Sequence, residues 1–591
     1  MSREEVVGQM RQQGRVGRVR SFDLWAPNAH RVRLQVGETR IDMKSESNGW
    51  WHLDARAPSG TDYAFLLDDT DTPLPDPRSR WQPFGVHGAS RVYDDRAFAW
   101  TDDGWRGRDL LGAVIYELHI GTFTIGATFD SAISRLDHLV ELGITHVEVL
   151  PVNAFNGVWN WGYDGVGWYA VHQPYGGPDG LKRFVDACHA RGLAVVLDVV
   201  YNHLGPSGNY LPRFGPYLKS GRSTWGDLVN LEATPVRRFI IDNALMWLRE
   251  YHIDGLRLDA VHALVDTSTP HLLAELSSAV SALSGRLGRP LSLIAESDLN
   301  DPVMITPLAA HGLGMDAQWD DDIHHALHAM LTGERQGYYV DFGSLEVFAK
   351  VWTSAFLHDG TYSTFRGRVH GRPVDRIHTP GYRFVGCLQN HDQVGNRAAG
   401  DRLSMIVSAG LLRVGAVLLF TSPFTPMVWM GEEWAASTPW PFFTSHPEPE
   451  LAAVTGPGRI EEFRHYGWDV SGMVDPQDPR AYRSAILKWD EVDTPGHREL
   501  LDLYRRLITL RSAELGLRDS RLDRVRVNYD EQARWLIVHR GPFGVLANLG
   551  SHVQTLDVAG DVVLATGPAE VTASGIRLGA ESAAIVRVTG S

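Results

Sequence analysis

Acidic side chains follow several short apolar segments in the middle of this chain. Asp259 follows "GLRL", Glu296 follows "LSLIA", and Asp392 closes "GCLQNHD". Carboxylates that converge from separate segments have two main uses. They bind hard cations, which prefer several oxygen ligands, or they cleave glycosidic bonds, where one carboxylate attacks the anomeric carbon and another protonates the leaving oxygen. Either use requires a fold that brings the three segments together.

Arg257 stands two residues before Asp259, and in a strand such residues point to the same face. The pair could be a structural ion pair, or the guanidinium could keep Asp259 ionised as a nucleophile. This pairing favours glycosidic cleavage. Glu296 ends a segment rich in Leu and Ile, which predicts a carboxyl that stays protonated. We expect His203 and His391, which follow two further strands, to hydrogen-bond sugar hydroxyls.

The middle of the chain alternates apolar strands with amphipathic helices, which is typical of a parallel sheet covered by helices. The expected strands are "AVIYELHIGTF", "ITHVEVLPV", "LAVVLDVVYNH", "IDGLRLDAV", "LSLIAESD", "GMDAQWDDD", "RFVGCLQNHD" and "TPMVWMGEE". Eight such units predict an α/β fold, the closed (β/α)8 TIM barrel, whose chemistry lies in the loops after the strands. An open doubly wound sheet is the alternative, but neither a GxGxxG after the first strand nor a P-loop occurs.

Short strands with alternating polarity flank this pattern at both ends of the chain. We predict an N-terminal β-sandwich, immunoglobulin-like and able to contact glucan, over residues 1–108. The barrel is expected over 109–515 and a C-terminal antiparallel β-domain over 516–591. Within the barrel, "DSAISRLDHLVELG" predicts one amphipathic helix that ends at Gly143.

Composition excludes several classes of protein. The net charge of −15 argues against a nucleic-acid-binding or anionic-membrane-binding surface. Two cysteines, Cys188 and Cys387, exclude a disulfide scaffold and suit a reducing compartment. Neither a signal peptide nor an apolar run of membrane-spanning length is visible, so we expect a cytoplasmic protein. The sequence does not indicate an oligomeric state.

Four of these stretches together resemble the α-amylase clan of retaining glycoside hydrolases. They are "DVVYNH", "GLRLDAVHA", "LIAESD" and "LQNHDQ", and they occur in the clan's order on the expected strands. The resemblance implies that Asp259 is the nucleophile, Glu296 the general acid/base and Asp392 the residue that distorts the sugar ring. It also implies that Asp198 pairs with Arg257. In "WGYDGVGWYAVHQPYGG", Tyr163 would stack on the sugar at the cleavage site.

Longer stretches look like one family of that clan, the maltooligosyltrehalose trehalohydrolases. They include "LPVNAFNGVWNWGYDGV", "DAQWDDDIHHALHAMLTGERQGYY" and "FVGCLQNHDQVGNR". Such enzymes release trehalose and a maltooligosaccharide from maltooligosyl trehalose, which would make that compound and related α-glucans the partners of this chain. An α-1,4-glucan hydrolase or glycogen-branching enzyme is the alternative. A non-catalytic carbohydrate-binding scaffold is remote, because all three carboxylates are present.

Selection of the trehalose end is expected from residues close to the catalytic ones. His262 and Gln393 are placed to contact the leaving disaccharide. The acidic run Asp320 to Asp322 could bind substrate or form a charge cluster at a helix N-terminus, and we expect the latter of at least one residue. Asn202 matches one calcium-ligand position of the clan, but further ligands are not recognisable, so no metal site and no cofactor are predicted.

Overall fold

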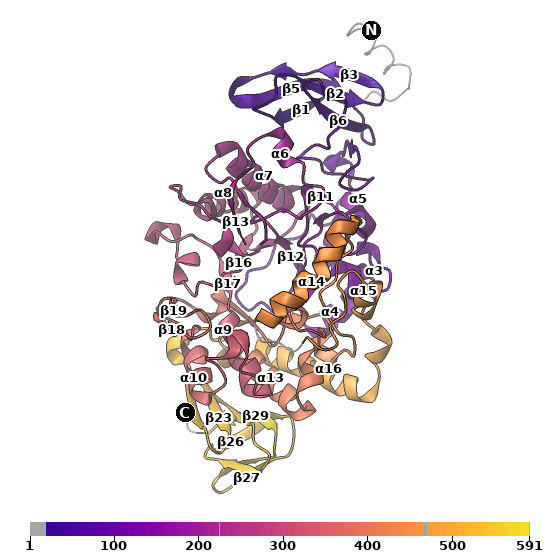
Figure 1. Ribbon diagram of the computed structural model, residues 1–591. Helices are drawn as coiled ribbons and strands as arrows, with labels where there is room; N and C mark the ends of the chain where they lie inside the picture. The colour runs from indigo at the N-terminus through magenta and orange to yellow at the C-terminus, as the bar shows by residue number, and fades with distance from the viewer. Residues whose placement is uncertain (1–18, 224, 466–469, 590–591) are drawn as a thin grey trace.

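The computed structural model describes residues 19–223, 225–465 and 470–589. Its centre is a closed barrel of parallel strands in the order β12-β15-β16-β17-β20-β21-β8-β9, with β9 pairing back to β12 (Figure 1). The strands are β8 (Ile115–Leu118), β9 (His146–Val149), β12 (Ala194–Val199), β15 (Gly255–Leu258), β16 (Ser292–Ala295), β17 (Ala317–Trp319), β20 (Phe384–Cys387) and β21 (Thr425–Trp429). All their residues are buried, which explains their continuous apolar runs. The predicted eight-stranded barrel is confirmed.

Helices alternate with these strands and cover the outside of the barrel. They are α3 (Phe129–Ile133), α4 (Leu136–Leu142), α5 (Gly177–Ala190), α7 (Thr234–Glu250), α8 (Leu272–Leu287), α9 (Asp321–Thr332), α10 (Leu345–Ser354), α13 (Ala409–Thr421) and α16 (Pro495–Ala513). The connection from β16 to β17 instead contains the 3₁₀ turns η5 (Pro302–Met304) and η6 (Leu308–Ala310). The segment that follows Glu296 at the rim of the barrel is therefore made of loops and short 3₁₀ turns.

The single helix predicted to end at Gly143 is wrong, because α3 and α4 are separate. The Ser134 hydroxyl donates to the carbonyl of Ser131 at 2.7 Å, and the Arg135 N–H closes a four-residue turn on the carbonyl of Ala132. Serine side chains compete with helical backbone bonds in this way. The end itself is as expected, since Gly143 takes a left-handed conformation with φ 96°.

The N-terminal part is built from two antiparallel sheets, β1-β5-β4 and β3-β2-β6-β7. The strands are β1 (Val19–Trp25), β2 (Val32–Val36), β3 (Thr39–Asp42), β4 (Lys44–Ser45), β5 (Trp50–Arg56), β6 (Asp62–Leu67) and β7 (Ser90–Arg91). Their buried residues include Phe22, Val32, Leu34 and Phe65, which belong to the main core. The expected N-terminal sheets are therefore present.

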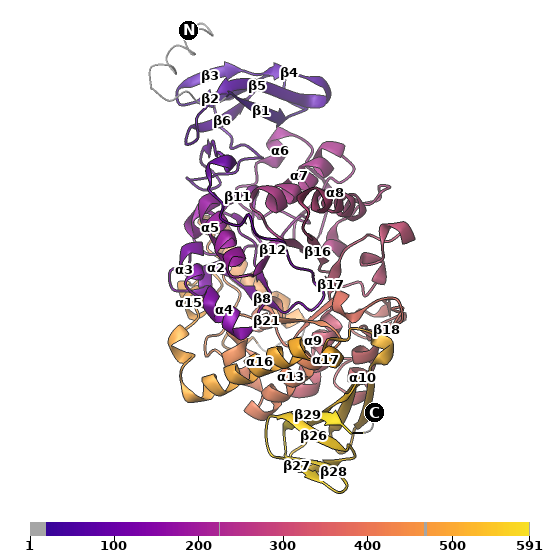
Figure 2. The ribbon, with the colours of Figure 1, turned by 180° about the vertical axis from the view of Figure 1, so that it is seen from behind.

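The C-terminal part consists of a five-stranded and a three-stranded antiparallel sheet. The first has the order β22 (Arg526–Asp530), β23 (Trp535–Arg540), β24 (Phe543–Asn548), β29 (Ser582–Val588), β26 (Gly560–Ala565); the second has β25 (Gln554–Leu556), β28 (Gly575–Leu578), β27 (Ala569–Thr572). Ile537, Leu546 and Ile576 share a small core of their own. The two β-parts lie at opposite ends of the molecule with the barrel between them (Figures 1 and 2).

The structure describes both cysteines and the helices that bear on the expectations about disulfide bonds and membrane spans. Cys188 and Cys387 are both buried and free. Among the described residues, no helix combines the length and apolarity needed to cross a membrane.

Candidate active site

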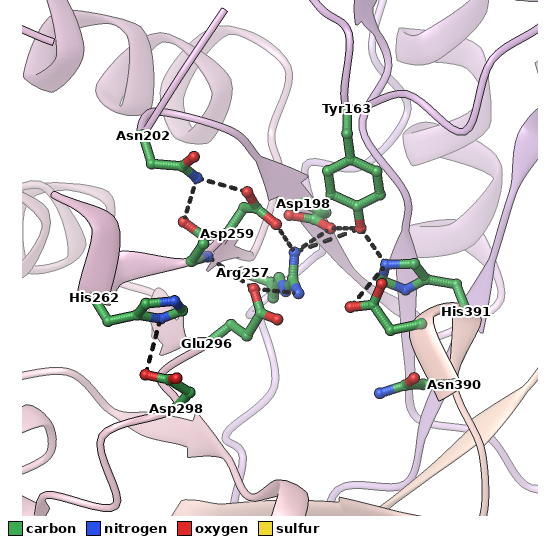
Figure 3. A network of polar contacts seen from close by, with 12 residues as sticks. Tyr163, Asp198, Asn202, Arg257, Asp259, His262, Glu296, Asp298, Asn390 and His391 are labelled. Carbon is green, nitrogen blue, oxygen red and sulfur yellow. Dashed lines mark hydrogen bonds and ion pairs between the residues drawn. The ribbon is translucent and has the colours of Figure 1, made fainter. Parts of the chain in front are cut away.

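The polar residues singled out by the sequence gather at one end of the barrel, where the parallel strands end, and Figure 3 shows those that lie around Arg257. In chain order they are Tyr163, Asp198, His203, Arg257, Asp259, His262, Glu296, His391, Asp392 and Gln393. Asp259 and Glu296 directly follow β15 and β16. The seventh strand ends at Cys387, earlier than predicted, so Asp392 lies instead in the first turn of the short helix α11 (His391–Gly395).

The Arg257 guanidinium is the centre of the site and is fully buried. Its Nη1 donates to Asp198 Oδ2 at 2.7 Å and to Asp259 Oδ1 at 2.9 Å. Its Nη2 forms an ion pair with Glu296 Oε2 at 2.7 Å (Figure 3). The guanidinium carbon lies 4.2 Å from the centre of the Trp319 ring. Arg257 and Asp259 are in contact, as their spacing predicted. The same guanidinium also contacts the carboxyl groups of Asp198 and Glu296.

The carboxylates around this guanidinium differ in how exposed their side chains are. The side chain of Asp198 is 2% exposed, Asp259 12% and Glu296 19%. Asp392 on α11 is 34% exposed. Asp198 is therefore buried behind the site, whereas the other three carboxylates are partly exposed and open to a substrate.

Backbone geometry after β15 fixes Asp259 and Glu296 relative to each other. Ala260 has a left-handed conformation with φ 40°, which is strained for a residue with a Cβ. In this conformation its N–H donates to Glu296 Oε2 at 2.7 Å. Asn202 Nδ2 donates to Asp259 Oδ2 at 2.6 Å and to the Asp259 carbonyl at 2.9 Å. Both carboxyl groups are thus held from two sides.

The surroundings of Glu296 differ from those expected. Strand β16 is apolar, as the sequence indicated, but its last residue is Ala295. The Glu296 carboxyl extends beyond the strand and contacts the Arg257 guanidinium and the Ala260 N–H. The Leu and Ile side chains of β16 therefore do not describe the surroundings of this carboxyl, and a protonated Glu296 stays a prediction.

Asp198 and Tyr163 form the inner wall of the site. The Tyr163 hydroxyl donates to Asp198 Oδ2 at 2.6 Å, and its ring stacks on His391 with centroids 5.1 Å apart. Burial raises the pKa of Asp198 to about 7 against the effect of Arg257, and the charge of Asp259 adds to this rise. The pairing of Asp198 with Arg257 is as expected.

Both rim histidines direct their ring nitrogens toward the protein. His391 Nδ1 lies 2.5 Å from Glu117 Oε1, and Nε2 lies 2.7 Å from the Tyr163 hydroxyl. His203 Nδ1 lies 2.5 Å from Asn202 Oδ1, and Nε2 lies 3.0 Å from the Tyr163 carbonyl. These contacts orient both rings, and their role toward sugar hydroxyls stays a prediction.

Comparison with known proteins identifies the family. A model of the alpha amylase catalytic domain matches residues 124–215, and a model of a domain of unknown function, DUF3459, matches residues 520–585. A malto-oligosyltrehalose trehalohydrolase from Arthrobacter ramosus is 55% identical over 96% of this chain and 100% of its own length. The chain belongs to the malto-oligosyltrehalose trehalohydrolase family. It is a glycoside hydrolase of the alpha-amylase family.

Two further comparisons support this placement of the trehalohydrolase-family chain. A crystal structure from Salmonella typhimurium, of a protein provisionally named an alpha amylase, has a TM-score of 0.89 and 35% identity and covers 97% of this chain and 98% of that one. A 1,4-alpha-glucan branching enzyme from Bordetella bronchiseptica is 30% identical over 62% of this chain and 56% of its own length. The similarity to the Arthrobacter trehalohydrolase is both higher and longer, which disfavours the branching-enzyme alternative.

Beside the rim of this trehalohydrolase-family barrel lies a small, partly open hollow. Its lining includes Asp298, Asn300, Asp321, Tyr338, His358 and Arg366. Arg366 forms an ion pair with Asp298 at 3.0 Å, and His262 lies 3.7 Å from the same carboxyl (Figure 3). The sequence interpretation did not single out Arg366, because its contact to Asp298 joins two segments that only the fold brings together.

His262 and Gln393 differ in how far they reach this region. The His262 side chain is 23% exposed, whereas Gln393 is buried and its Oε1 accepts a bond from the Tyr338 hydroxyl at 3.3 Å. A contact of Gln393 with substrate stays a prediction.

The acidic run at the start of α9 is a helix N-terminal cluster, one of the two expected alternatives. Asp320 is the N-cap and accepts from the N–H of Asp322 at 3.1 Å. Burial raises the pKa of Asp321 to about 8, and the charges of Glu296 and Asp392 add to the rise. Asp321 thus also contributes to the electrostatics of the rim.

Two buried carboxyl groups at the barrel interior were missed. Glu117 on β8 and Glu148 on β9 lie opposite each other in the strand register and are each 1% exposed. A charged residue inside an otherwise apolar strand, as in "VIYELHI" and "THVEVLP", was the available signal.

The clan's calcium position is occupied by contacts within the protein. Asn202 uses its amide for Asp259 and His203. Among the residues described, no group of three or more His, Cys, Asp or Glu side chains is arranged to hold a metal ion.

Proposed function

We propose that this enzyme hydrolyses the α-1,4 bond next to the terminal trehalose unit of maltooligosyl trehalose. The products are trehalose and a maltooligosaccharide. The observation that carries this function is the family membership, which spans 96% of the chain at 55% identity. The local geometry supports it, because two partly exposed carboxyls, Asp259 and Glu296, face the nitrogens of one guanidinium.

We assign the chemistry to three carboxylates, in a double displacement that retains the configuration at C1. Glu296 gives its proton to the bridging oxygen as the bond from that oxygen to C1 breaks, and trehalose leaves. The Asp259 carboxylate bonds to C1 and forms a β-linked glycosyl-enzyme. Glu296, now ionised, takes a proton from water, whose oxygen bonds to C1 and releases the maltooligosaccharide in the α configuration. The carboxyls should approach to about 5–5.5 Å, as retaining pairs do.

The remaining rim residues support these steps in our assignment. Asp392 steadies the distorted sugar ring of the transition state. Arg257 holds the Asp259 carboxyl in position through its Nη1, and Asp198 and Tyr163 hold Arg257 in place. We place the trehalose unit on the side of the rim toward Asp298, because the partly exposed His262 lies 3.7 Å from this carboxyl.

Product analysis on two substrates tests the function. Maltotriosyl trehalose and maltopentaose are offered separately at equal concentration. Rapid release of trehalose from the first, with slow cleavage of the second, is expected. Comparable cleavage of both would reduce the function to that of a general α-1,4-glucan hydrolase, and longer branched products would indicate a branching enzyme.

A matched variant links the products to the assigned site. Glu296→Gln keeps the shape of the side chain but cannot donate or accept the proton, so trehalose release should fall by about four orders of magnitude. Turnover close to that of the unmodified enzyme would overturn the assignment of Glu296.

A further inference from the structure

A chain of hydrogen bonds connects the barrel interior to the proposed nucleophile. It begins at Glu117 on β8. The Oε1 atom of Glu117 lies 2.5 Å from the ring nitrogen Nδ1 of His391, and its Oε2 accepts a bond from the backbone N–H of His391 at 3.0 Å. It continues from His391 Nε2 to the Tyr163 hydroxyl, which donates to Asp198 Oδ2. From there Arg257 connects it to Asp259. Glu117 is 1% exposed, so it does not contact substrate itself.

The direction of each bond in this chain follows from the chemistry of its members. Arg257 can only donate, so Asp198 Oδ2 accepts and carries no proton. The single Tyr163 hydroxyl proton points to that oxygen, so the Tyr163 oxygen must accept from His391 Nε2–H. His391 Nδ1 faces a carboxylate and also carries a proton. With the Glu117 carboxylate as the acceptor at Nδ1, the complete set of bonds requires His391 as an imidazolium, with protons on both ring nitrogens.

A neutral His391 would reverse part of the chain. With its proton on Nδ1, the ring would take the Tyr163 hydroxyl proton at Nε2, and Asp198 would lose that donor. Asp198 has little access to solvent, and its Oδ1 has no hydrogen-bond partner among the described residues. Its replacement donor would have to come from within the site. The positive charge 3.5 Å from Asp392 Oδ2 would vanish as well.

Charged and titratable groups face His391 from every neighbouring element. They are Glu117 on β8, His119 after β8, Glu148 on β9, Tyr163, Arg257 on β15 and Asp392 on α11. The rings of Trp161, Trp319 and Trp429 complete the enclosure. Burial opposes the charged imidazole, but Asp392 and Glu117 outweigh it and raise the pKa of His391 to about 9.

We propose that Glu117 is a positioning residue that keeps His391 doubly protonated and thereby fixes the direction of the hydrogen bonds that end on Asp259. This inference rests on the proposed roles of the rim carboxylates. Glu117 acts through His391 and Tyr163, and both of its oxygens are used for that purpose. Loss of its charge leaves the imidazole free to lose a proton in the working pH range.

The variants Glu117→Gln and Glu148→Gln form a matched pair. Both residues are buried and lie opposite each other in the register, but only Glu117 contacts His391. Burial and the neighbouring Glu117 raise the pKa of Glu148 well above its usual range, which favours the neutral carboxyl that a glutamine resembles. Measuring kcat against pH for both variants, with melting temperatures, separates the loss of the contact from the loss of a buried carboxyl.

The expected result is specific for Glu117. In Glu117→Gln, kcat falls by about tenfold or more, and the alkaline limb of its pH profile moves down by about one unit or more. In Glu148→Gln, kcat stays within about twofold of that of the unmodified enzyme, and the alkaline limb of the pH profile does not move. An unshifted alkaline limb in a folded Glu117→Gln protein, or an equal shift in both variants, overturns the proposal.

A double-mutant cycle with His391→Gln tests the route of the effect. If Glu117 acts through His391, then adding Glu117→Gln to His391→Gln changes kcat little further. Independent, multiplicative losses would overturn the proposal. If the unmodified enzyme cleaves α-glucans without releasing trehalose, then the proposed function fails, while the same cycle measured on that glucan still decides the role of Glu117.

Discussion

Asp254 and Asp259 lie at the two ends of the same four-residue strand, β15, and have opposite surroundings. Asp254, directly before the strand, is 2% exposed, and His189 Nε2 lies 2.9 Å from its Oδ2. Arg289 and the Trp105 indole N–H complete its partners. Asp259, directly after the strand, is 12% exposed. One carboxylate is enclosed by its partners, and the other is open to solvent.

The two ends also differ in their balance of charge. At the N-terminal end, His189 lies between Asp102 and Asp254, and Arg289 provides a further cation. At the C-terminal end, one guanidinium faces three carboxyls, Asp198, Asp259 and Glu296. An ion cluster that is balanced and closed stabilises the fold, whereas a surplus of partly open carboxyls is suited to chemistry on a substrate. Breaking each end should therefore have a different consequence.

The largest effect on catalysis is expected from Asp259→Asn. The amide cannot attack the anomeric carbon, so kcat should fall by about four orders of magnitude. The melting temperature should change little, because the buried Arg257 keeps Asp198 and Glu296 as counter-charges. A variant that retains substantial kcat, or one that loses its fold, would contradict this view of the open end of β15.

The matched change at the other end is Asp254→Asn. It leaves Arg289 without its buried counter-charge and removes one of the two carboxylates that flank His189, which should lower the free energy of unfolding by about 3 kcal/mol. Thermal unfolding measures this loss, and kcat of the folded protein should remain near normal. Asp103→Asn, at an exposed neighbouring carboxylate, is the control and should leave the melting temperature unchanged. A loss of kcat without a loss of stability would remove the distinction between the two ends.

The smallest effect is expected from removal of divalent cations. Asn202, at the clan's calcium position, already contacts Asp259 and His203, so the surplus carboxylates should not need a cation. Activity after treatment with a chelator should equal that before it. Loss of activity that calcium restores would show that the open end of β15 is completed by a metal ion.

Much of the site could be predicted because it lies in short segments at strand ends. The eight apolar runs predicted the strands, and parallel strands place the residues after them on one rim. Arg257 and Asp259 are close because of the two-residue period of a strand. The domain boundaries and the catalytic roles remain predictions that the structure does not test.

Other features were beyond such local reasoning. The break between α3 and α4 depends on the Ser134 hydroxyl competing with the helix, which amphipathic spacing does not reveal. The polar surroundings of Glu296 depend on Arg257 and Ala260, which belong to a neighbouring strand and its loop. The hollow that includes Arg366 combines segments with no common pattern in the sequence.

The sequence by itself determined the barrel, its strand order and the identity of the three carboxylates at the rim, because strand period and strand polarity are local properties. Only the tertiary structure decided which charges meet. Glu117 and His391 are 274 residues apart in the chain and 2.5 Å apart in space. Closure of the barrel leaves only β21 between β20, which His391 follows, and β8, which carries Glu117. This long-range packing sets the burial and the counter-charges on which protonation depends.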